Sequence, residues 1–326
     1  DVAGLGTLAD ALAVIHRPPP TAQLDSLIDG DHPAVQRLAI EELLAHHLAL
    51  ARLNRARAKQ HADALVDEAG KVDDLLDLFP FEPTGAQKRV IGEIADDLAG
   101  TRPMRRLLQG DVGSGKTLVA AAAAAQAVGA GAQAAIIAPT EILAEQHREN
   151  FSAWLVPMGL EPVWLAGKVT GKARTAALEK LADGAPVAIG THALFQEGVD
   201  FRNLRLVVVD EQHRFGVHQR LALAAKGSED LGGGETRIPH QLVMTATPIP
   251  RTLAMTAYAG LDVSVIDELP PGRKPVTTAL IHQDRREELV ERIRAQLAAG
   301  HQAYWVCPLI EESDALEAEA AETTWE

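Results

Sequence analysis

The feature that most constrains the fold is a series of short apolar runs that alternate with longer helical stretches from about residue 105 onward. Such alternation is typical of a parallel sheet covered by helices. The run Leu204–Val209 is apolar without interruption from Leu206, which predicts a central strand buried on both faces. An α/β protein is therefore expected, with further strands at Arg106–Gln109, Ala134–Ala138, Pro162–Leu165, Pro186–Ile189 and Gln241–Thr245.

The segment before this sheet, residues 1–78, is predicted to be a helical linker region. A long helix should begin at Pro33, because Asp31 and His32 precede it as a cap precedes a first turn. Apolar residues recur at helical intervals from Val35 to Val66. The basic residues of this helix form either a solvated face, the interpretation we favour, or a contact for nucleic-acid phosphates; they are Arg52, Arg55, Arg57 and Lys59.

Two later segments are predicted to be irregular. Residues 226–239 combine charge with three consecutive glycines, so we expect a mobile surface loop there. Residues 269–275 (LPPGRKP) are expected to link two domains, the first spanning residues 79–268 and the second beginning, truncated, at residues 276–326. The elements expected in the second domain are a strand at Thr277–Ile281, a helix at Arg285–Ala299 and a strand at Gln302–Val306.

Composition restricts the partners and the compartment. The 326 residues include 31 Lys and Arg against 45 Asp and Glu, a formal net charge of −14. A nucleic-acid partner would therefore be held by local features and not by a cationic surface. The single cysteine excludes an intrachain disulfide and favours the cytoplasm. The run Leu118–Ala125 is far shorter than the roughly 20 residues of a membrane crossing, so no membrane partner is expected.

The segment Gly110–Thr117 (GDVGSGKT) fits the phosphate-loop pattern, in which GxxxxGK is followed by Ser or Thr. It lies between a predicted strand and an alanine-rich stretch, where such a loop must lie. Lys116 is expected to neutralise the β- and γ-phosphates of a nucleotide, and the Thr117 hydroxyl to ligate Mg²⁺. The loop residues expected to surround the phosphate oxygens are Gly110, Gly113, Ser114 and Gly115.

Two acidic residues, Asp210 and Glu211, directly follow the buried run 204–209. Ligands of open parallel sheets bind outside the carboxyl ends of the strands, which is where this pair should lie. Asp210 would hold Mg²⁺ through water, and Glu211 would act as general base or orient the attacking water. An Asp-Glu pair after a strand is otherwise often a helix cap, but the phosphate loop favours the catalytic interpretation.

Small hydroxyl residues follow three other predicted strands, in Pro139-Thr140-Glu141, Gly190-Thr191-His192 and the segment Thr245–Arg251. Hydroxyls and free backbone N–H groups at helix starts can contact a phosphodiester backbone without a basic surface. Such contacts would reconcile DNA binding with the negative net charge. Thr140, Thr191 and His192 are therefore candidate DNA contacts, although each threonine taken singly is equally well explained as a helix N-cap.

Five ordered segments resemble motifs I, Ia, Ib, II and III of superfamily 2 helicases, specifically the RecG branch of ATP-dependent DNA translocases. Leu269–Arg273 and Gln302–Cys307 support the resemblance, which spans about residues 79–313. The five segments are Gly110–Thr117, Ala138–His147 (APTEILAEQH), Ile189–Gln196 (IGTHALFQ), Asp210–Val217 (DEQHRFGV) and Met244–Arg251 (MTATPIPR).

The resemblance implies a RecA-like sheet that binds ATP and Mg²⁺. By similarity, Gln87 would read adenine, and Phe81 is a weaker candidate for packing on the base. Gln212 and His213 would relay the state of the γ-phosphate toward the segment Thr245–Thr247. Arg251 would serve either that coupling or DNA contact.

The RecG branch remodels branched DNA, so the implied function is an ATP-dependent DNA helicase acting on stalled replication forks and Holliday junctions. The implied protein is a monomer, with single-stranded DNA-binding protein as a further candidate partner. The wedge domain and motifs V and VI of the family are not found in the 326 residues, so we expect this chain alone to bind Mg-ATP weakly and to hydrolyse it poorly.

Two alternatives remain open. The motor of the transcription-repair coupling translocase shares the GTH, HRFGV and TATPIPRT strings, although Asp210-Glu-Gln-His and Pro139-Thr-Glu-Ile fit the RecG branch better. The other alternative is a nucleotide-gated DNA-binding module with little turnover, which describes the isolated chain.

Overall fold

The computed structural model describes residues 5–22, 24–211, 215, 226–246, 261–268 and 277–306. The chain divides into two compact units, residues 1–271 and residues 272–326, and each is described by itself. No helix in the described ranges is both long and apolar enough to span a membrane.

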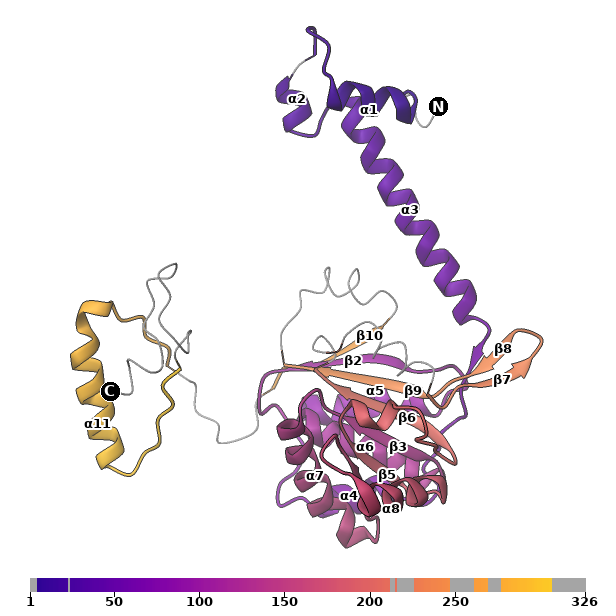
Figure 1. Ribbon diagram of the computed structural model, residues 1–326, viewed down its shortest axis with the longest axis vertical. Helices are drawn as coiled ribbons and strands as arrows, with labels where there is room; N and C mark the ends of the chain where they lie inside the picture. Colours follow the sequence, from indigo (N-terminus) through magenta and orange to yellow (C-terminus); the bar gives the residue numbers. More distant parts are fainter. Residues whose placement is uncertain are drawn as a thin grey trace. The chain divides into compact units, whose positions relative to one another are not determined.

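The main sheet of the first unit has seven parallel strands in the order β10-β2-β9-β6-β3-β5-β4 (Figure 1). All six predicted strands are present, and β6 occupies the central position that its uninterrupted apolar run requires. The seventh strand, β10, was not predicted, because it lies at an edge and has a polar residue, Ser264, in its middle. The strands are β2 (Arg105–Gly110), β3 (Gln133–Ile137), β4 (Val163–Leu165), β5 (Val187–Gly190), β6 (Leu204–Asp210), β9 (His240–Thr245) and β10 (Asp262–Ile266).

Helices cover both faces of this sheet, and alternate residues of one strand enter separate cores. In β3, Ala134 and Ile136 belong to one hydrophobic cluster, whereas Ala135 and Ile137 belong to the other. The fold is the predicted RecA-like α/β sheet with flanking helices. The first cluster includes residues of α4 (Lys71–Asp77), α5 (Gly85–Leu98), α6 (Lys116–Gly129) and α7 (Glu141–Leu155), and the second includes residues of α8 (Gly171–Ala182) and η2 (His192–Phe195); η1 (Val156–Met158) follows α7.

Helix α6 follows the phosphate loop and is buried around its whole circumference. The run Ala120–Ala125 has at most 2% exposure at any position, so this helix has no solvated stripe. Small side chains let it lie close to the strands and to α4 and α5. The polar Gln126 is accommodated because its amide donates to the carbonyls of Leu65 and Ala95, at 2.8 and 3.1 Å.

The N-terminal segment is helical, as predicted. The long helix α3 (Pro33–Arg57) begins at the predicted residue, and the His32 Nδ1 accepts a hydrogen bond from the Ala34 N–H at 3.1 Å. The helix ends well before Val66, where the predicted periodicity ended. It is preceded by α1 (Leu8–His16), which packs on it, and by α2 (Leu24–Ile28).

A second, three-stranded sheet overturns the prediction of a mobile loop at residues 226–239. A hairpin forms there, and its second strand pairs in parallel with β1 (Figure 1, hairpin in orange). Gly232, Gly233 and Gly234 all have positive φ, so the glycines make a turn instead of disordering the segment. Charge also orders it, because the buried Arg205 pairs with Asp63 and with Glu229. The strands are β1 (Gln60–His61), β7 (Glu229–Gly232) and β8 (Glu235–Arg237).

The second unit contains η4 (Gln283–Arg285) and α11 (Arg286–Ala298), the latter within one residue of the predicted helix at both ends. The strands expected at residues 277–281 and 302–306 do not form, so those two predictions are wrong. Both segments are exposed and have no strand partner in the described part of the chain. An extended segment needs a neighbouring strand to satisfy its backbone groups, and a local apolar pattern cannot supply one.

Candidate nucleotide site

The predicted site residues gather at the carboxyl edge of the main sheet. Strands β2, β6 and β9 are adjacent in the sheet and parallel, so the segments that follow them meet at one edge. The phosphate loop follows β2, Asp210 ends β6, and Thr245 ends β9. This topology brings together residues that lie more than 130 positions apart in the sequence.

The phosphate loop has a backbone that glycine makes possible. Gly113 and Gly115 have φ of +80° and +90°, and a Cβ at Gly110 would collide with the Ser114 hydroxyl. The Ser114 Oγ is buried and has no hydrogen-bond partner among the described residues. A tight turn with an unsatisfied buried hydroxyl and backbone N–H groups at a helix start fits a bound phosphate.

The Lys116 ammonium is hydrogen-bonded to the first residues of its own phosphate loop. Its Nζ donates to the carbonyls of Gly110 and Asp111, at 2.6 and 3.0 Å. Burial lowers the pKa of the Lys116 ammonium below its ordinary value, and the negative charges of Asp210 and Glu211 oppose that shift. The lysine is therefore a partly desolvated cation close to both acidic residues, and its carbonyl partners can be exchanged for phosphate oxygens.

Gln87, on helix α5, is hydrogen-bonded to the phosphate loop and holds it in place. Its side-chain Nε2 donates to the Ser114 carbonyl at 2.8 Å, and its Oε1 accepts from the Thr84 N–H at 2.8 Å. Thr84 in turn caps the Gln87 N–H, which completes a capping box at the start of α5. The side chain is 2% exposed. Phe81, the weaker candidate for base packing, is 53% exposed and makes an edge contact with Phe79.

The Asp210 carboxylate is held by a histidine from another helix. The His147 Nε2 lies 2.8 Å from the Asp210 Oδ2, and both side chains are largely buried. His147 lies on α7 and packs edge-on against Phe151, with ring centroids 6.3 Å apart. The Asp210 carboxylate thus has a fixed partner on one oxygen.

The Glu211 carboxylate is held by the end of β9. Its two oxygens accept from the Ala246 N–H at 3.0 Å and from the Thr245 hydroxyl at 3.2 Å. The Glu211 backbone also donates to the Met244 carbonyl at 2.9 Å. Glu211 has φ of +48°, the one positive value at a non-glycine residue in the described chain. Strained backbone of this kind is concentrated at functional sites, where surrounding contacts hold it in place.

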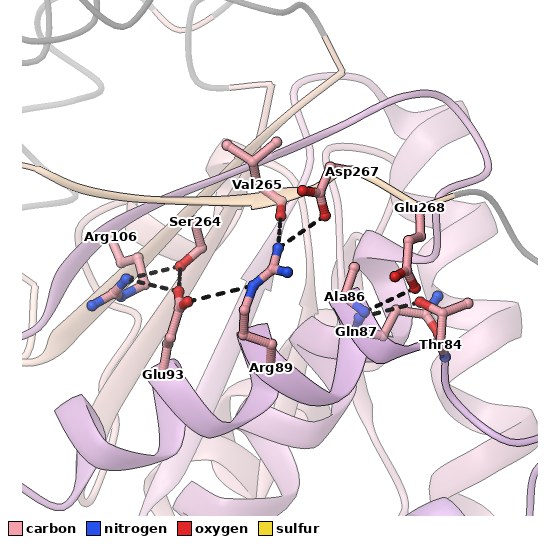
Figure 2. Close-up of polar contacts among 10 residues, drawn as sticks. All are labelled: Thr84, Ala86, Gln87, Arg89, Glu93, Arg106, Ser264, Val265, Asp267 and Glu268. Carbon is pink, nitrogen blue, oxygen red and sulfur yellow. Dashed lines mark hydrogen bonds and ion pairs between the residues drawn. The ribbon is translucent and has the colours of Figure 1, made fainter.

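Strand β10 and the two residues after it form polar contacts with helix α5, as Figure 2 shows. The Glu268 carboxylate accepts from the Ala86 N–H at 3.0 Å, at the positive end of α5. The Arg89 guanidinium donates to the Val265 carbonyl and to Asp267, each at 2.9 Å. Hydrogen bonding to Asp267 raises the pKa of Arg89, and the same bond lowers the pKa of Asp267.

A cavity of about 220 Å³ lies between β10 and the beginning of the phosphate loop. Residues of β2 and β10 and residues that follow β2, β9 and β10 line it, including Gly110, Asp111, Ala246 and Glu268. It is therefore continuous with the loop that the nucleotide interpretation requires.

The candidate DNA contacts differ in accessibility. Thr140 is exposed and caps α7, accepting from the Leu143 N–H at 3.4 Å. Thr191 is 2% exposed, and its hydroxyl caps η2 by accepting from the Ala193 N–H at 3.5 Å. His192 is exposed beside it. Gln212, His213 and Arg251 lie outside the described residues.

Sequence reasoning missed three supporting contacts: those of His147, Thr245 and Glu268. His147 and Thr245 lie inside segments that resemble motifs, yet nothing in their spacing assigned them a partner. A signal existed for His147, which is seven residues after the Thr140 cap and so lies two turns further along the same side of α7. Glu268 has no comparable signal, because its partner is 182 positions away.

A glycine-turn loop between strand β2 and a buried helix, with two acids at the end of β6, the next strand but one in the sheet, defines a P-loop nucleotide-binding protein with a RecA-like sheet. The DEAD/DEAH box helicase model matches residues 84–256, which is more than half of the chain. The chain therefore belongs to the DEAD/DEAH box helicase family.

Named relatives refine this assignment. The chain is 58% identical over 325 residues to the ATP-dependent DNA helicase RecG of Escherichia coli O127:H6, covering 99% of this chain and 46% of that protein. It is 56% identical over 322 residues to that of Haemophilus influenzae, covering 98% of this chain and 46% of the relative. The chain thus spans about half the length of these relatives.

A solved structure gives the same result. A structure of RecG bound to a three-way DNA junction matches with a TM-score of 0.72 and 41% identity, covering 85% of this chain and 36% of that one. The resemblance to RecG that was inferred from five motifs is confirmed, and so is the RecA-like fold.

Proposed function

We propose that this chain is the ATP-binding portion of a DNA helicase of the RecG type that remodels branched DNA, including stalled replication forks and Holliday junctions. The observation that carries the proposal is the convergence of Lys116, Asp210 and Glu211 at one sheet edge in a chain 58% identical to a RecG protein. Residues 79–268 would form the first motor domain and residues 276–326 the beginning of the second, joined by the linker at 269–275.

The proposed chemistry uses ATP with Mg²⁺. Lys116 would exchange its two carbonyl partners for phosphate oxygens, and the loop residues Gly110, Gly113, Ser114 and Gly115 would surround the phosphates. Thr117 and Asp210 would hold Mg²⁺, which neutralises charge on the phosphates. Glu211 would take the proton of the attacking water, with Thr245 and Ala246 keeping its carboxylate aimed.

Gln87 receives a second role in this proposal. Its amide accepts a hydrogen bond from Thr84 and donates one to the Ser114 carbonyl, so it connects the start of α5 to the phosphate loop. Reading adenine would require one of these hydrogen bonds to be exchanged for the base. Adenine recognition and loop placement would then be linked through a single side chain. His213 would respond to the γ-phosphate.

The DNA contacts proposed are Thr140, Thr191, His192 and Arg251; Thr191 is 2% exposed and caps η2, so contact through its hydroxyl would require that cap to open. These groups suit a phosphodiester backbone, which fits a net charge of −14. We further propose a monomer that acts in the cytoplasm, with single-stranded DNA-binding protein as a second partner.

The test is DNA-stimulated ATP hydrolysis by a chimera in which this chain replaces the matching segment of the E. coli relative. Lys116→Ala and Glu211→Gln should each lower turnover by about 10²-fold or more, because each removes a group required in the transition state. An unchanged rate in both variants would refute the site. The unjoined chain, which covers 46% of that relative, should bind nucleotide but turn it over poorly.

Binding to RNA polymerase by the chimera would instead favour the transcription-repair coupling alternative. Binding of DNA without hydrolysis in the intact chimera would favour a nucleotide-gated module.

A further inference from the structure

We propose that His147 is a positioning residue for Mg²⁺ binding: through its hydrogen bond to Asp210 it fixes which carboxylate oxygen faces the metal. The proposal rests on the proposed function, because it deepens the role of Asp210 in the same site. It is carried by the 2.8 Å contact between the His147 Nε2 and the Asp210 Oδ2.

The surroundings of the imidazole define its donor. The His147 Nδ1 is buried and has no hydrogen-bond partner among the described residues, while Nε2 faces a carboxylate. A buried N–H without an acceptor is costly, so the proton belongs on Nε2, where the carboxylate accepts it. His147 therefore donates to Asp210, and no change of protonation is needed for this role.

The donated hydrogen bond restricts the carboxylate. An aspartate carboxylate rotates readily about its last bond, and at a strand end it could present either oxygen to the phosphate loop. With Oδ2 engaged by His147, the Oδ1 remains for the water shell of the metal. Hydrogen-bond partners of this kind orient metal-binding groups, and their loss typically costs about 10- to 100-fold in metal affinity or activity.

The imidazole itself is held in place. His147 is 7% exposed, and the fully buried Phe151 packs against its ring one turn further along α7. The cap of α7 at Thr140, a candidate DNA contact, lies two turns before His147. One helix therefore carries a candidate DNA contact at its start and the hydrogen-bond partner of the Asp210 carboxylate in its middle.

The experiment measures affinity of this chain for a fluorescent ATP analogue, once with excess Mg²⁺ and once with EDTA. We expect His147→Ala to weaken binding about 10-fold in Mg²⁺ and to leave binding in EDTA unchanged. His147→Gln should recover most of the loss, because its amide N–H reaches about as far as the imidazole Nε2. Titration of Mn²⁺ by electron paramagnetic resonance, in the presence of ATP, should show the same order of affinities.

Leu155→Ala is the matched control for stability. Leu155 is fully buried in the same helix, two turns beyond His147, so its truncation should lower the melting temperature without changing the Mg²⁺ dependence. A His147→Ala variant that loses affinity equally in Mg²⁺ and in EDTA would behave like this control, and the proposal would be overturned in favour of a purely structural histidine.

Two further variants separate the possible failures. In an Asp210→Asn background, His147→Ala should cause no additional loss of Mg²⁺-dependent affinity, and an additive loss would overturn the proposal. Lys116→Ala should weaken binding in both conditions. If it does not, the nucleotide site itself is wrong, whereas a normal Lys116→Ala result with an unaffected His147→Ala rejects the positioning role alone.

Discussion

Single residues at the carboxyl edge of the sheet show that the two acids are held by different parts of the fold. Asp210 is hydrogen-bonded to His147 of α7 and Glu211 to Thr245 at the end of β9, so each carboxylate has its own support. The backbone of Glu211 is strained, with φ of +48°, and the two carboxylates have different hydrogen-bond partners. Support of this kind matters because catalytic groups lose efficiency when displaced by about 1 Å.

Thr245→Val should therefore lower turnover by about 10-fold in the chimera while leaving nucleotide affinity unchanged. Valine keeps the shape of threonine but removes the hydroxyl that donates to Glu211, and hydrogen bonds to charged groups contribute about 1.5–3 kcal/mol. Steady-state kinetics gives the result as a fall in kcat at constant KM. A fall in affinity without a change in kcat would contradict the proposed role.

Gly115→Ala should abolish nucleotide binding. A methyl group there would meet the Gln87 amide, and φ of +90° disfavours any L side chain by about 1–3 kcal/mol. Combining it with Gln87→Ala removes the collision but not the backbone strain. Calorimetric titration with ATP should thus show partial recovery at most, and full recovery in the double variant would show that strain is unimportant.

His240 makes the fold sensitive to acid. The ring is fully buried between the Met104 N–H, which donates to Nδ1 at 3.0 Å, and the Asp63 carbonyl, 2.9 Å from Nε2. Burial lowers the pKa of His240 below 6.5, so the unfolded chain takes up the proton first as pH falls. Stability should be constant above that pH and decline below it, down to the pKa in the folded state.

Urea unfolding between pH 7.5 and about 5 measures this dependence. The decline should be smaller in His240→Gln, which cannot be protonated, even if that variant is less stable at neutral pH. An equal decline in both proteins would assign the acid sensitivity to other groups.

The candidate site residues that can be proposed from the sequence are those identified by local spacing. The phosphate loop needs eight consecutive residues, and the acidic pair needs a strand before it, so both are visible without coordinates. The contacts of His147 and Thr245 span 63 and 34 positions. They depend on which strands and helices become neighbours, and no local pattern specifies that.

At the scale of elements, the strands that were predicted have a local apolar pattern, and those that were missed depend on contacts with distant residues. The six predicted strands are covered on both faces and read as apolar runs. Strand β10 and the hairpin β7–β8 are edge or exposed elements, stabilised by ion pairs and glycine turns, so their sequences look irregular. Strand β8 of the hairpin pairs with β1 (Gln60–His61), and Arg205 of β6 pairs with Asp63 and with Glu229 of the hairpin. These contacts attach the end of the linker region to the main sheet.

Arg205→Met should loosen this attachment before the main sheet opens. Arg205 is 6% exposed, but its partners Asp63 and Glu229 are themselves about half exposed. Because solvent screens these pairs, the substitution should lower the free energy of unfolding of this region by about 1–3 kcal/mol, less than the loss of a fully buried pair. Hydrogen exchange should accelerate at residues 229–237 and leave β6 protected. Lys180→Ala, which removes an exposed pair at 3.9 Å, should change neither.

At the scale of the whole molecule, the net charge of −14 restricts how the proposed DNA partner could be bound. Each cationic contact to duplex phosphates contributes about −0.9 to the slope of log affinity against log salt concentration. The proposed contacts are mostly neutral: the Thr140 hydroxyl and backbone N–H groups carry no charge and so displace no counterions from DNA. We therefore expect a slope of about −2 or shallower for binding of a forked duplex by this chain, measured by fluorescence anisotropy.

A steep slope would point to the basic residues of α3 instead. Arg52, Arg55 and Lys59 are exposed on or just beyond that helix, and they offer the alternative contact for phosphates. Replacing all three with glutamine should leave a shallow slope unchanged, because a solvated face binds no DNA. If the slope is steep and the substitution flattens it by about one unit for each charge removed, DNA is bound by the linker helix, and the strand-end hydroxyls are then caps alone.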